Sequence, residues 1–439
     1  MPDRRTRAGW FFFQHSSVWQ ASWRSAVCAA AIVTLVALPD FVGVSIGGTS
    51  PDEEITLDRA VELAREHSPD LAAVAQELTI AHGELTKASY LSPYNPEIFN
   101  EGDWRPRTNQ PGTQDWRVAL SQQIEIFGQR ALRIKSANLN LREQQLILSD
   151  RMRLLSAAVK LTFLDACRAR DQAKLLEELR ALDSRLLDAA RTRLEAGEIG
   201  QIDFNLAQVR YGESARALIE GRERYRLQRS SLGRLLGEAA GPEPIPAANV
   251  PLVLSDYKLA ELIASAMENR PDLRAREIEV SRLETEESLN SRLALPNLTV
   301  GAFGGHELNN EYPMGGLLGF SIPLFNRRQG EAETIRGQIL RAKQLLLANR
   351  LDVEKQVRDA YSAYQAARES LSIYQTDVIQ PAQESFDLLE QAFLAGKIDL
   401  LRLAVAEREA FQARMRYLDA WFQVNAARVS IELATGAPS

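Results

Sequence analysis

An alternating segment gives way to a very long helical one at Gln123-Ile124-Glu125-Ile126-Phe127-Gly128. The stretch that follows, from Gln129 to Ala196, contains neither glycine nor proline. Leucines recur within it at helical spacing, at Leu175, Leu179, Leu182 and Leu186. At about 1.5 Å per residue, one helix over this stretch reaches roughly 100 Å, which is wider than a globular core. The sequence therefore predicts an elongated, mainly helical protein.

The same succession of features occurs twice, at an offset of about 200 residues, and such internal repeats decide the architecture. Four collinear pairs of segments carry the duplication: Ser68-Pro69-Asp70-Leu71 and Arg270-Pro271-Asp272-Leu273, Gln123–Gly128 and Ser321–Asn326, Ala196-Gly197-Glu198-Ile199 and Ala395-Gly396-Lys397-Ile398, and Leu235-Leu236-Gly237 and Ala434-Thr435-Gly436. We expect a first repeat over residues 51–245 and a second over 246–439. Each is predicted to contain a helix, a strand pair and two long helices. In the second repeat, Pro381 is expected to kink or break the long helix.

Residues 1–50 differ in composition from the rest and are predicted to be a signal peptide and leader. Arginines at positions 4, 5, 7 and 24 precede an apolar run from Ala26 to Leu38. A membrane anchor is the alternative, but about 13 apolar residues fall short of the roughly 20 that span a bilayer. Lipidation of Cys28 is a further alternative. The apolar stretch lies after this cysteine instead of before it, which disfavours the modification.

Two alternating segments precede each long helical stretch. In the first repeat, Trp116, Val118, Leu120 and Ile124 fall on one face, and Arg117, Ala119, Ser121 and Gln123 fall on the other. The second repeat shows the same alternation at Leu298, Val300 and Ala302, and again at Leu318, Phe320, Ile322 and Leu324. A less regular segment lies around Glu97 to Trp104. Alternation over about ten residues is typical of transmembrane β-strands, which are apolar toward lipid and polar toward the lumen.

Four strands are too few to close a barrel, and an open sheet edge in hydrocarbon leaves backbone groups unpaired. Several copies of the chain must therefore share one barrel if these strands enter a membrane. Two copies would give eight strands, whose interior is filled by side chains, whereas three give twelve and leave a lumen. If the strands form a transport pore, the sequence therefore predicts at least a homotrimer.

Several classes of function are disfavoured by composition and by missing motifs. The net charge of -6 gives no support for nucleic-acid binding, which calls for a basic face. The four histidines, at positions 15, 67, 82 and 306, form no metal-binding pattern. Gly301, Gly304 and Gly305 lack the helix start and the lysine of a phosphate-binding loop. We therefore expect no cofactor, no metal site and no enzymatic activity.

One motif connects the chain to a known family. Arg193-Leu194-Glu195-Ala196-Gly197, followed by Asp203 and by Ala207-Gln208, resembles the outer-membrane factors of tripartite efflux pumps and type I secretion. The resemblance extends from about Thr56 to Gly436 and includes the duplication. It implies that a periplasmic adaptor docks at Arg193, Leu194, Gly197, Asp203 and Gly396. Gly396 lies in the corresponding turn of the second repeat, which departs from the motif. Ala392 stands there in place of the arginine, and Arg402 in place of the aspartate. A plain turn between helices explains the two glycines equally well.

The resemblance also implies an architecture and partners. The fold would be mainly α with a small β part and internally duplicated. Its long helical hairpins would form a trimeric α-barrel through the periplasm. Four strands per chain would contribute to a shared 12-stranded transmembrane β-barrel in the lipid of the outer membrane. The implied partners are a periplasmic adaptor of the membrane fusion class and an inner-membrane pump of the resistance-nodulation-division type, which supplies the energy.

A second motif bears on the cargo. Gln122 to Arg130 resembles the junction of channels paired with heavy-metal-exporting pumps, which favours metal cations. We hypothesise an acidic entrance formed by Glu195, Glu198, Asp203 and Asp399, although these groups could simply complement nearby arginines. Two other classes remain as alternatives to the efflux channel and to a type I secretion exit channel. They are a periplasmic coiled-coil scaffold or adaptor-like protein, and an envelope enzyme.

Overall fold

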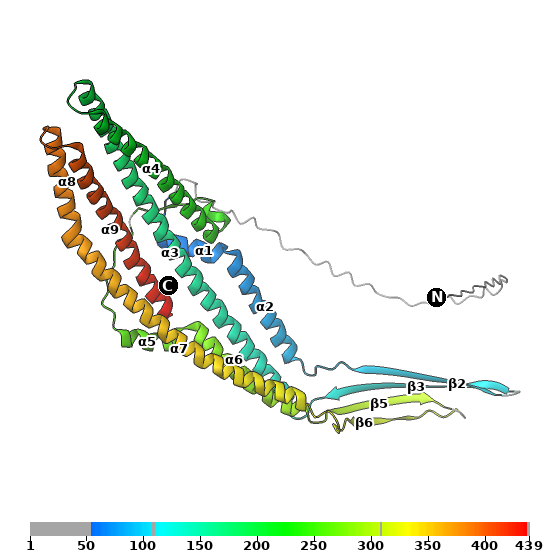
Figure 1. Cartoon of the computed structure of the whole chain (residues 1–439). Coiled ribbons are helices and arrows are strands. Elements are labelled where there is room, and N and C mark those ends of the chain that lie inside the picture. The colour runs from blue at the N-terminus through cyan, green and yellow to red at the C-terminus, as the bar shows by residue number, and fades with distance from the viewer. Residues whose placement is uncertain (1–53, 108–109, 249, 308–309, 437–439) are drawn as a thin grey trace, which may run out of the picture. The chain divides into compact units, whose positions relative to one another are not determined.

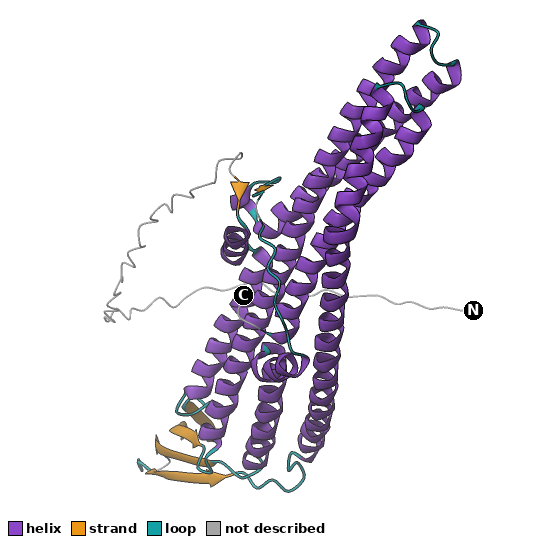
Figure 2. Cartoon of the chain, turned by 90° about the vertical axis from the view of Figure 1, so that its left-hand side faces the viewer, coloured by secondary structure: helices purple, strands orange, loops and turns teal. Residues whose placement is uncertain are grey.

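The computed structural model describes residues 54–107, 110–248, 250–307 and 310–436. The predicted signal peptide, leader and Cys28 lie outside the described residues. The described residues form a long body, with helices running side by side, a small sheet at one end and two helical turns at the other (Figures 1 and 2). Among the described helices, none combines the length and apolarity needed to cross a membrane.

Six elements make up the body of the first repeat, and their order recurs in the second. The first repeat contains α1 (Leu57–His67), α2 (Pro69–Ser89), β2 (Glu97–Arg107), β3 (Gln110–Ile124), α3 (Gln129–Glu195) and α4 (Gln201–Leu236). The second contains α5 (Leu259–Asn269), α6 (Pro271–Leu293), β5 (Leu298–His306), β6 (Met314–Phe320), α7 (Gln329–Ile373), α8 (Ile379–Leu394) and α9 (Leu400–Thr435). Short strands β1 (Glu54–Ile55) and β4 (Ile245–Pro246) pair in parallel, and η1 (Glu238–Ala240) is a 3₁₀ turn. The predicted mainly helical, duplicated fold is confirmed.

The long helix of the second repeat is interrupted where its sequence contains proline. Helix α3 is continuous over 67 residues. In contrast, a π-helical segment, η2 (Tyr374–Val378), separates α7 from α8. Pro381 lacks an N–H group, and its ring excludes the carbonyl of Asp377, four residues earlier and inside that segment. The break expected at Pro381 is confirmed, and it takes the form of a widened helical turn.

The four longer strands form one antiparallel sheet in the order β2-β3-β5-β6. The two repeats meet at its centre, where β3 pairs with β5 from Trp116↔His306 to Ile124↔Leu298. The less regular segment beginning at Glu97 is therefore a strand, held by its pairing with β3. Ile322 and Leu324 were expected to extend the last strand. They instead follow it, because β6 ends at Phe320 and Pro323 cannot donate to a ladder.

Cross-strand pairs share a face of the sheet, which makes the sheet strongly amphipathic. One face is largely apolar and its side chains are exposed; it includes Ile98, Trp104, Trp116, Val118, Leu120, Met314, Leu318 and Phe320. The opposite face includes Glu101, Asp103, Arg105, Asp115 and Arg117, which line a charged hollow of about 340 Å³ with Glu307. Within the described residues, strands β2 and β6 each have one edge without a partner strand.

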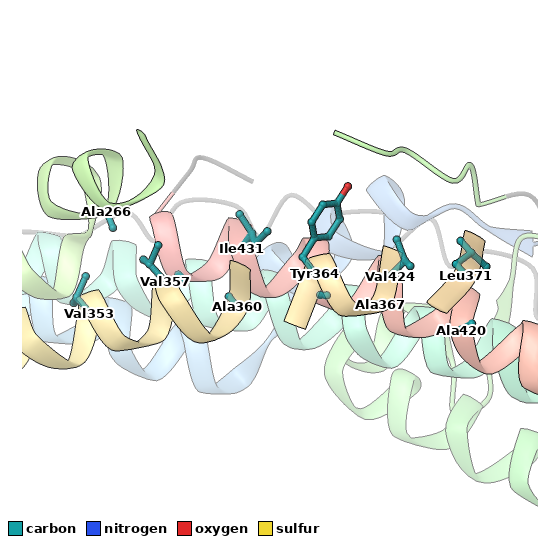
Figure 3. Close-up of a cluster of buried hydrophobic side chains, with 12 residues drawn as sticks. Ala266, Val353, Val357, Ala360, Tyr364, Ala367, Leu371, Ala420, Val424 and Ile431 are labelled. Carbon is teal, nitrogen blue, oxygen red and sulfur yellow. The ribbon is translucent and has the colours of Figure 1, made fainter. Parts of the chain in front are cut away.

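A core of small residues brings α7 and α9 close together below α5. Val353, Val357 and Val424 line this contact together with alanines at positions 360, 367, 420 and 427 (Figure 3). Tyr364 is the largest fully buried side chain there. Its hydroxyl donates to the Ser255 carbonyl at 3.0 Å and accepts from the Ser255 N–H at 2.9 Å. This contact ties the segment between the two repeats to the helical body.

Candidate functional site

The two hairpin turns at the end opposite the sheet have the same backbone geometry. Gly197 and Gly396 adopt positive φ angles of 75° and 72°. The Glu198 N–H donates to the Arg193 carbonyl at 2.9 Å, and the Lys397 N–H donates to the Ala392 carbonyl at 2.9 Å. These are the 6→1 bonds of a Schellman motif, which satisfies the last carbonyls of a helix and requires a residue tolerant of the left-handed region. Both glycines are therefore needed by the turns themselves.

The helix that follows each turn begins with a carboxylate, but the carboxylate comes from a different position in each repeat. Asp203 accepts a hydrogen bond from the Gly200 N–H at 3.4 Å, reaching back from the first turn of α4. Asp399 is itself the N-cap of α9 and accepts from the Arg402 N–H at 2.9 Å. Arg402 thus replaces the aspartate of the first repeat without loss of the cap, because Asp399 supplies the oxygen instead.

Arg193 joins the two turns. Its Nη2 donates to the Phe393 carbonyl at 3.1 Å, and its guanidinium carbon lies 4.6 Å from the centre of the Phe393 ring. Phe393 is buried in a cluster that draws on both hairpins and includes Leu186, Ala190, Ala207 and Leu403. The most specific residue of the sequence motif therefore points to the other repeat, where it holds the tips together.

The other predicted tip residues are dispersed around this contact. Leu194 and Asp203 are half-buried, while Gly197 and Gly396 are exposed at the turns. Of the predicted acidic groups, Glu195 and Asp399 are exposed. Glu198 lies 4.0 Å from the Arg193 guanidinium. The four carboxylates lie at the same end of the molecule, and three of them also have local partners in a cap or an ion pair.

Sequence reasoning missed a buried charge cluster further along the hairpins. Arg210 of α4 forms ion pairs with Asp183 of α3, at 3.3 Å, and with Glu407 of α9. A weak signal existed in the sequence, since Ala207-Gln208 recurs as Ala406-Glu407 at the offset of the two tip glycines. No group of three or more histidine, cysteine or acidic residues in the described part of the chain is arranged to hold a metal ion.

The segment from Gln122 to Arg130 forms the junction between sheet and helices. Glu125 is almost fully buried, and both of its carboxylate oxygens accept from Arg133 Nη1, at 2.7 and 2.8 Å. Arg130 donates to the carbonyls of Ser89 and Tyr90 at the end of α2. These contacts fix the angle at which α3 leaves the sheet.

The second repeat reproduces the core of this junction. Gly128 and Arg328 both have positive φ angles, of 77° and 60°, immediately before α3 and α7. Gln129 accepts from the Phe127 N–H and Gln329 from the Arg327 N–H, both at 2.8 Å. The conformation at both sites is thus set by a side-chain amide that closes the loop before the helix.

Comparisons with known proteins agree with this architecture. A family model described as outer membrane efflux protein matches residues 262–437. The cobalt-zinc-cadmium resistance protein CzcC of Cupriavidus metallidurans is 27% identical over 384 residues, which cover 87% of this chain and 90% of that protein. The pyoverdine export outer membrane protein OpmQ of Pseudomonas putida is 24% identical, over 82% and 81% of the two chains. A crystal structure of CusC has a TM-score of 0.73 at 16% identity, covering 87% of this chain and 92% of that one. The second half of the chain thus matches the outer membrane efflux protein model, and the similarity to CzcC and the fold shared with CusC extend over most of the chain.

Proposed function

We propose that three copies of this chain form the outer-membrane channel of a tripartite efflux system, a passive conduit for heavy-metal cations. A periplasmic adaptor would bind its hairpin tips, and an inner-membrane pump of the resistance-nodulation-division type would supply the energy. The observation that carries the proposal is the amphipathic sheet with two unpaired edges, continuous with two long helical hairpins.

The sheet supports a shared barrel on energetic grounds. Its apolar face exposes Trp116, Leu120 and Leu318, a costly arrangement in water and a favourable one in lipid. An unpaired strand edge costs several kcal/mol per backbone group in hydrocarbon, so β2 of one copy would pair with β6 of the next. Four strands from each of three copies give a closed barrel of twelve.

The tips support adaptor docking through surfaces that the chain leaves exposed. The Arg193 guanidinium already donates a hydrogen bond to Phe393, so its contribution to docking would be mainly to fix the conformation of the tip. Ile202 and Val209 follow Gly197 in α4, about two helical turns apart, and these residues are 83% and 61% exposed. The proposed contact surface therefore combines Gly197, Asp203 and Gly396 with this apolar strip.

The proposed cargo rests on two observations. The relative CzcC is a cobalt-zinc-cadmium resistance protein by name, and its similarity extends over most of both chains. In addition, the four tip carboxylates would be present three times each in a trimer, and such a ring favours cations at a pore entrance. OpmQ, a pyoverdine export protein by name, is similar over a comparable share of both chains, so the test of cargo compares metals with organic compounds.

Edge-strand crosslinking tests the shared barrel. Ile98→Cys on β2 and Leu318→Cys on β6 lie on the same face at opposite edges of the sheet, and Cys167→Ala removes the buried native thiol. We expect disulfide-linked trimers in outer-membrane fractions, whereas Val118→Cys on the interior strand β3, in the same background, gives none. A protein that is extracted without detergent and never crosslinks would instead be a periplasmic scaffold.

Growth assays test the cargo. A strain lacking this protein should become sensitive to cobalt, zinc and cadmium while its tolerance of organic drugs and its secretion of proteins stay unchanged. Joint replacement of Glu195, Glu198, Asp203 and Asp399 by the corresponding amides should lower the cation preference of single channels in planar bilayers. An unchanged preference would show that these carboxylates serve only as caps and arginine partners.

A further inference from the structure

The cluster of Asp183, Arg210 and Glu407 lies where the first hairpin meets the second. Asp183 and Arg210 face each other between α3 and α4, and Glu407 approaches from α9, which packs against α3. The side chains of Asp183 and Glu407 are only 5% and 3% exposed. This is the one place in the described residues where two nearly inaccessible carboxylates share a single guanidinium.

The charges of this cluster do not balance. Two carboxylates and one guanidinium leave one excess negative charge on two largely buried acidic side chains. Oε1 of Glu407 and Nη1 of Arg210 each lack a hydrogen-bond partner, and Oδ1 of Asp183 has only its 3.3 Å ion pair with Arg210. A buried charge without compensation costs several kcal/mol, so the site gains stability by taking up a proton.

Arg408 of α9 is a further positive charge beside the cluster, but its side chain is exposed to solvent. It repels Arg210 and is not among the groups that act on Asp183. Glu407 also lines a groove of about 380 Å³ between α3, α8 and α9, where the other charged groups are Glu178, Arg185, Glu390 and Arg414. The charges of these two acidic and two basic side chains cancel. Burial raises the pKa of Asp183 above its ordinary 3.8, and this effect outweighs the lowering by Arg210 and by the Ser214 hydroxyl, which hydrogen-bonds to Asp183.

We infer that the cluster of Asp183, Arg210 and Glu407 is a proton-binding site that couples the two repeats. With a proton on Asp183, the site is neutral, and Arg210 joins α4 to α9 through Glu407. When that proton leaves, the excess charge weakens the contact between the hairpins. The inference concerns the joint between hairpins and does not depend on which cargo the channel carries.

The direction of the pH effect follows from linkage. Because the native state holds the proton on Asp183 to higher pH than the unfolded chain does, this stabilisation is fully present below about 3.8. It is lost as the pH rises through the native pKa of Asp183. Asp183→Asn and Glu407→Gln each remove one negative charge and leave a neutral pair with Arg210. Both variants should therefore melt at a higher temperature than the parent at pH 8, by about 2 °C or more, and converge with it in acid.

The test is a set of melting curves of the full-length protein in detergent. They are recorded by circular dichroism at pH values from below about 3.8 up to 8. Asp188→Asn on the exposed side of α3 and Glu409→Gln on α9 are matched controls and should run parallel to the parent. Arg210→Met should show a steeper loss of stability with rising pH. Infrared spectra add a direct readout: as the pH is lowered from 8, the band of protonated carboxyls should begin to grow at a higher pH in the parent than in Asp183→Asn and Glu407→Gln. Parallel melting curves for all variants, or the same growth of this band in the parent and in both variants, would overturn the inference.

Discussion

Arg193 and Phe393 are 200 residues apart in the chain, yet the guanidinium of one binds both the carbonyl and the ring of the other. The contact connects corresponding turns of the two repeats. Because the second turn has Ala392 where the first has Arg193, the interaction is made once per chain and in one direction only. The duplication has therefore diverged at the place where its two copies touch.

We expect Arg193→Met to separate the tips, since it keeps the stem but removes the charge-assisted hydrogen bond and the cation–π contact. The loss should be about 2 kcal/mol in the local contact. Spin labels at Glu195 and Lys397 should report a longer and broader distance distribution by pulsed electron paramagnetic resonance. The matched control is Arg191→Met, an exposed arginine two residues earlier with no ion pair in the described residues. If Arg193→Met and Arg191→Met gave the same distance distribution, Arg193 would not be the residue that holds the two tips together.

Gly197→Ala should destabilise the protein by about 1–2 kcal/mol, because its φ of 75° is unfavourable for a residue with a Cβ. A Cβ added there meets no atom within 4 Å, so the cost is purely conformational. Gly396→Ala should behave alike. Gly83→Ala is the control, since Gly83 lies inside α2 with equally open surroundings and should stabilise by about 0.5–1 kcal/mol. Denaturant unfolding measures the change in unfolding free energy, which should fall for Gly197→Ala and rise for Gly83→Ala. A change of the same sign in both variants would refute this explanation of the turns.

Cys167 should be unreactive in the folded protein. Burial raises the pKa of its thiol to about 12, so only about one molecule in ten thousand carries the thiolate at pH 8. We expect maleimide labelling to be negligible in the native protein and complete after denaturation. Ser288→Cys, at an exposed position of α6, should label rapidly in the folded state. Rapid labelling of native Cys167 would mean that the contact between α3 and the segment around Ala247 opens readily.

The features that sequence predicted well are those fixed by local pattern. The absence of glycine and proline after Gly128 predicted α3, and Pro381 predicted the break before α8. Burial of charge was not predictable, because Arg210 and Glu407 look like any other charged residues of an amphipathic helix. Their roles depend on contacts between helices about 200 residues apart in sequence, which no local pattern records. Arg193 was singled out by its motif, but its partner in the second repeat could be seen only in three dimensions.

The motif around Glu125 was also singled out by sequence, and its physical role became visible only in the structure. Glu125 is 2% exposed and depends on Arg133, so Arg133→Met should leave a buried unpaired carboxylate and cost about 3–5 kcal/mol. Adding Glu125→Gln to Arg133→Met should recover much of that loss, because no charge then remains in the junction. The yield of heat-resistant trimer, together with a double-mutant cycle of unfolding free energies, measures the coupling. If the motif instead recognises cargo, the double variant would fold normally but lose metal tolerance, whereas a junction that only joins sheet to helices predicts that tolerance returns with the fold.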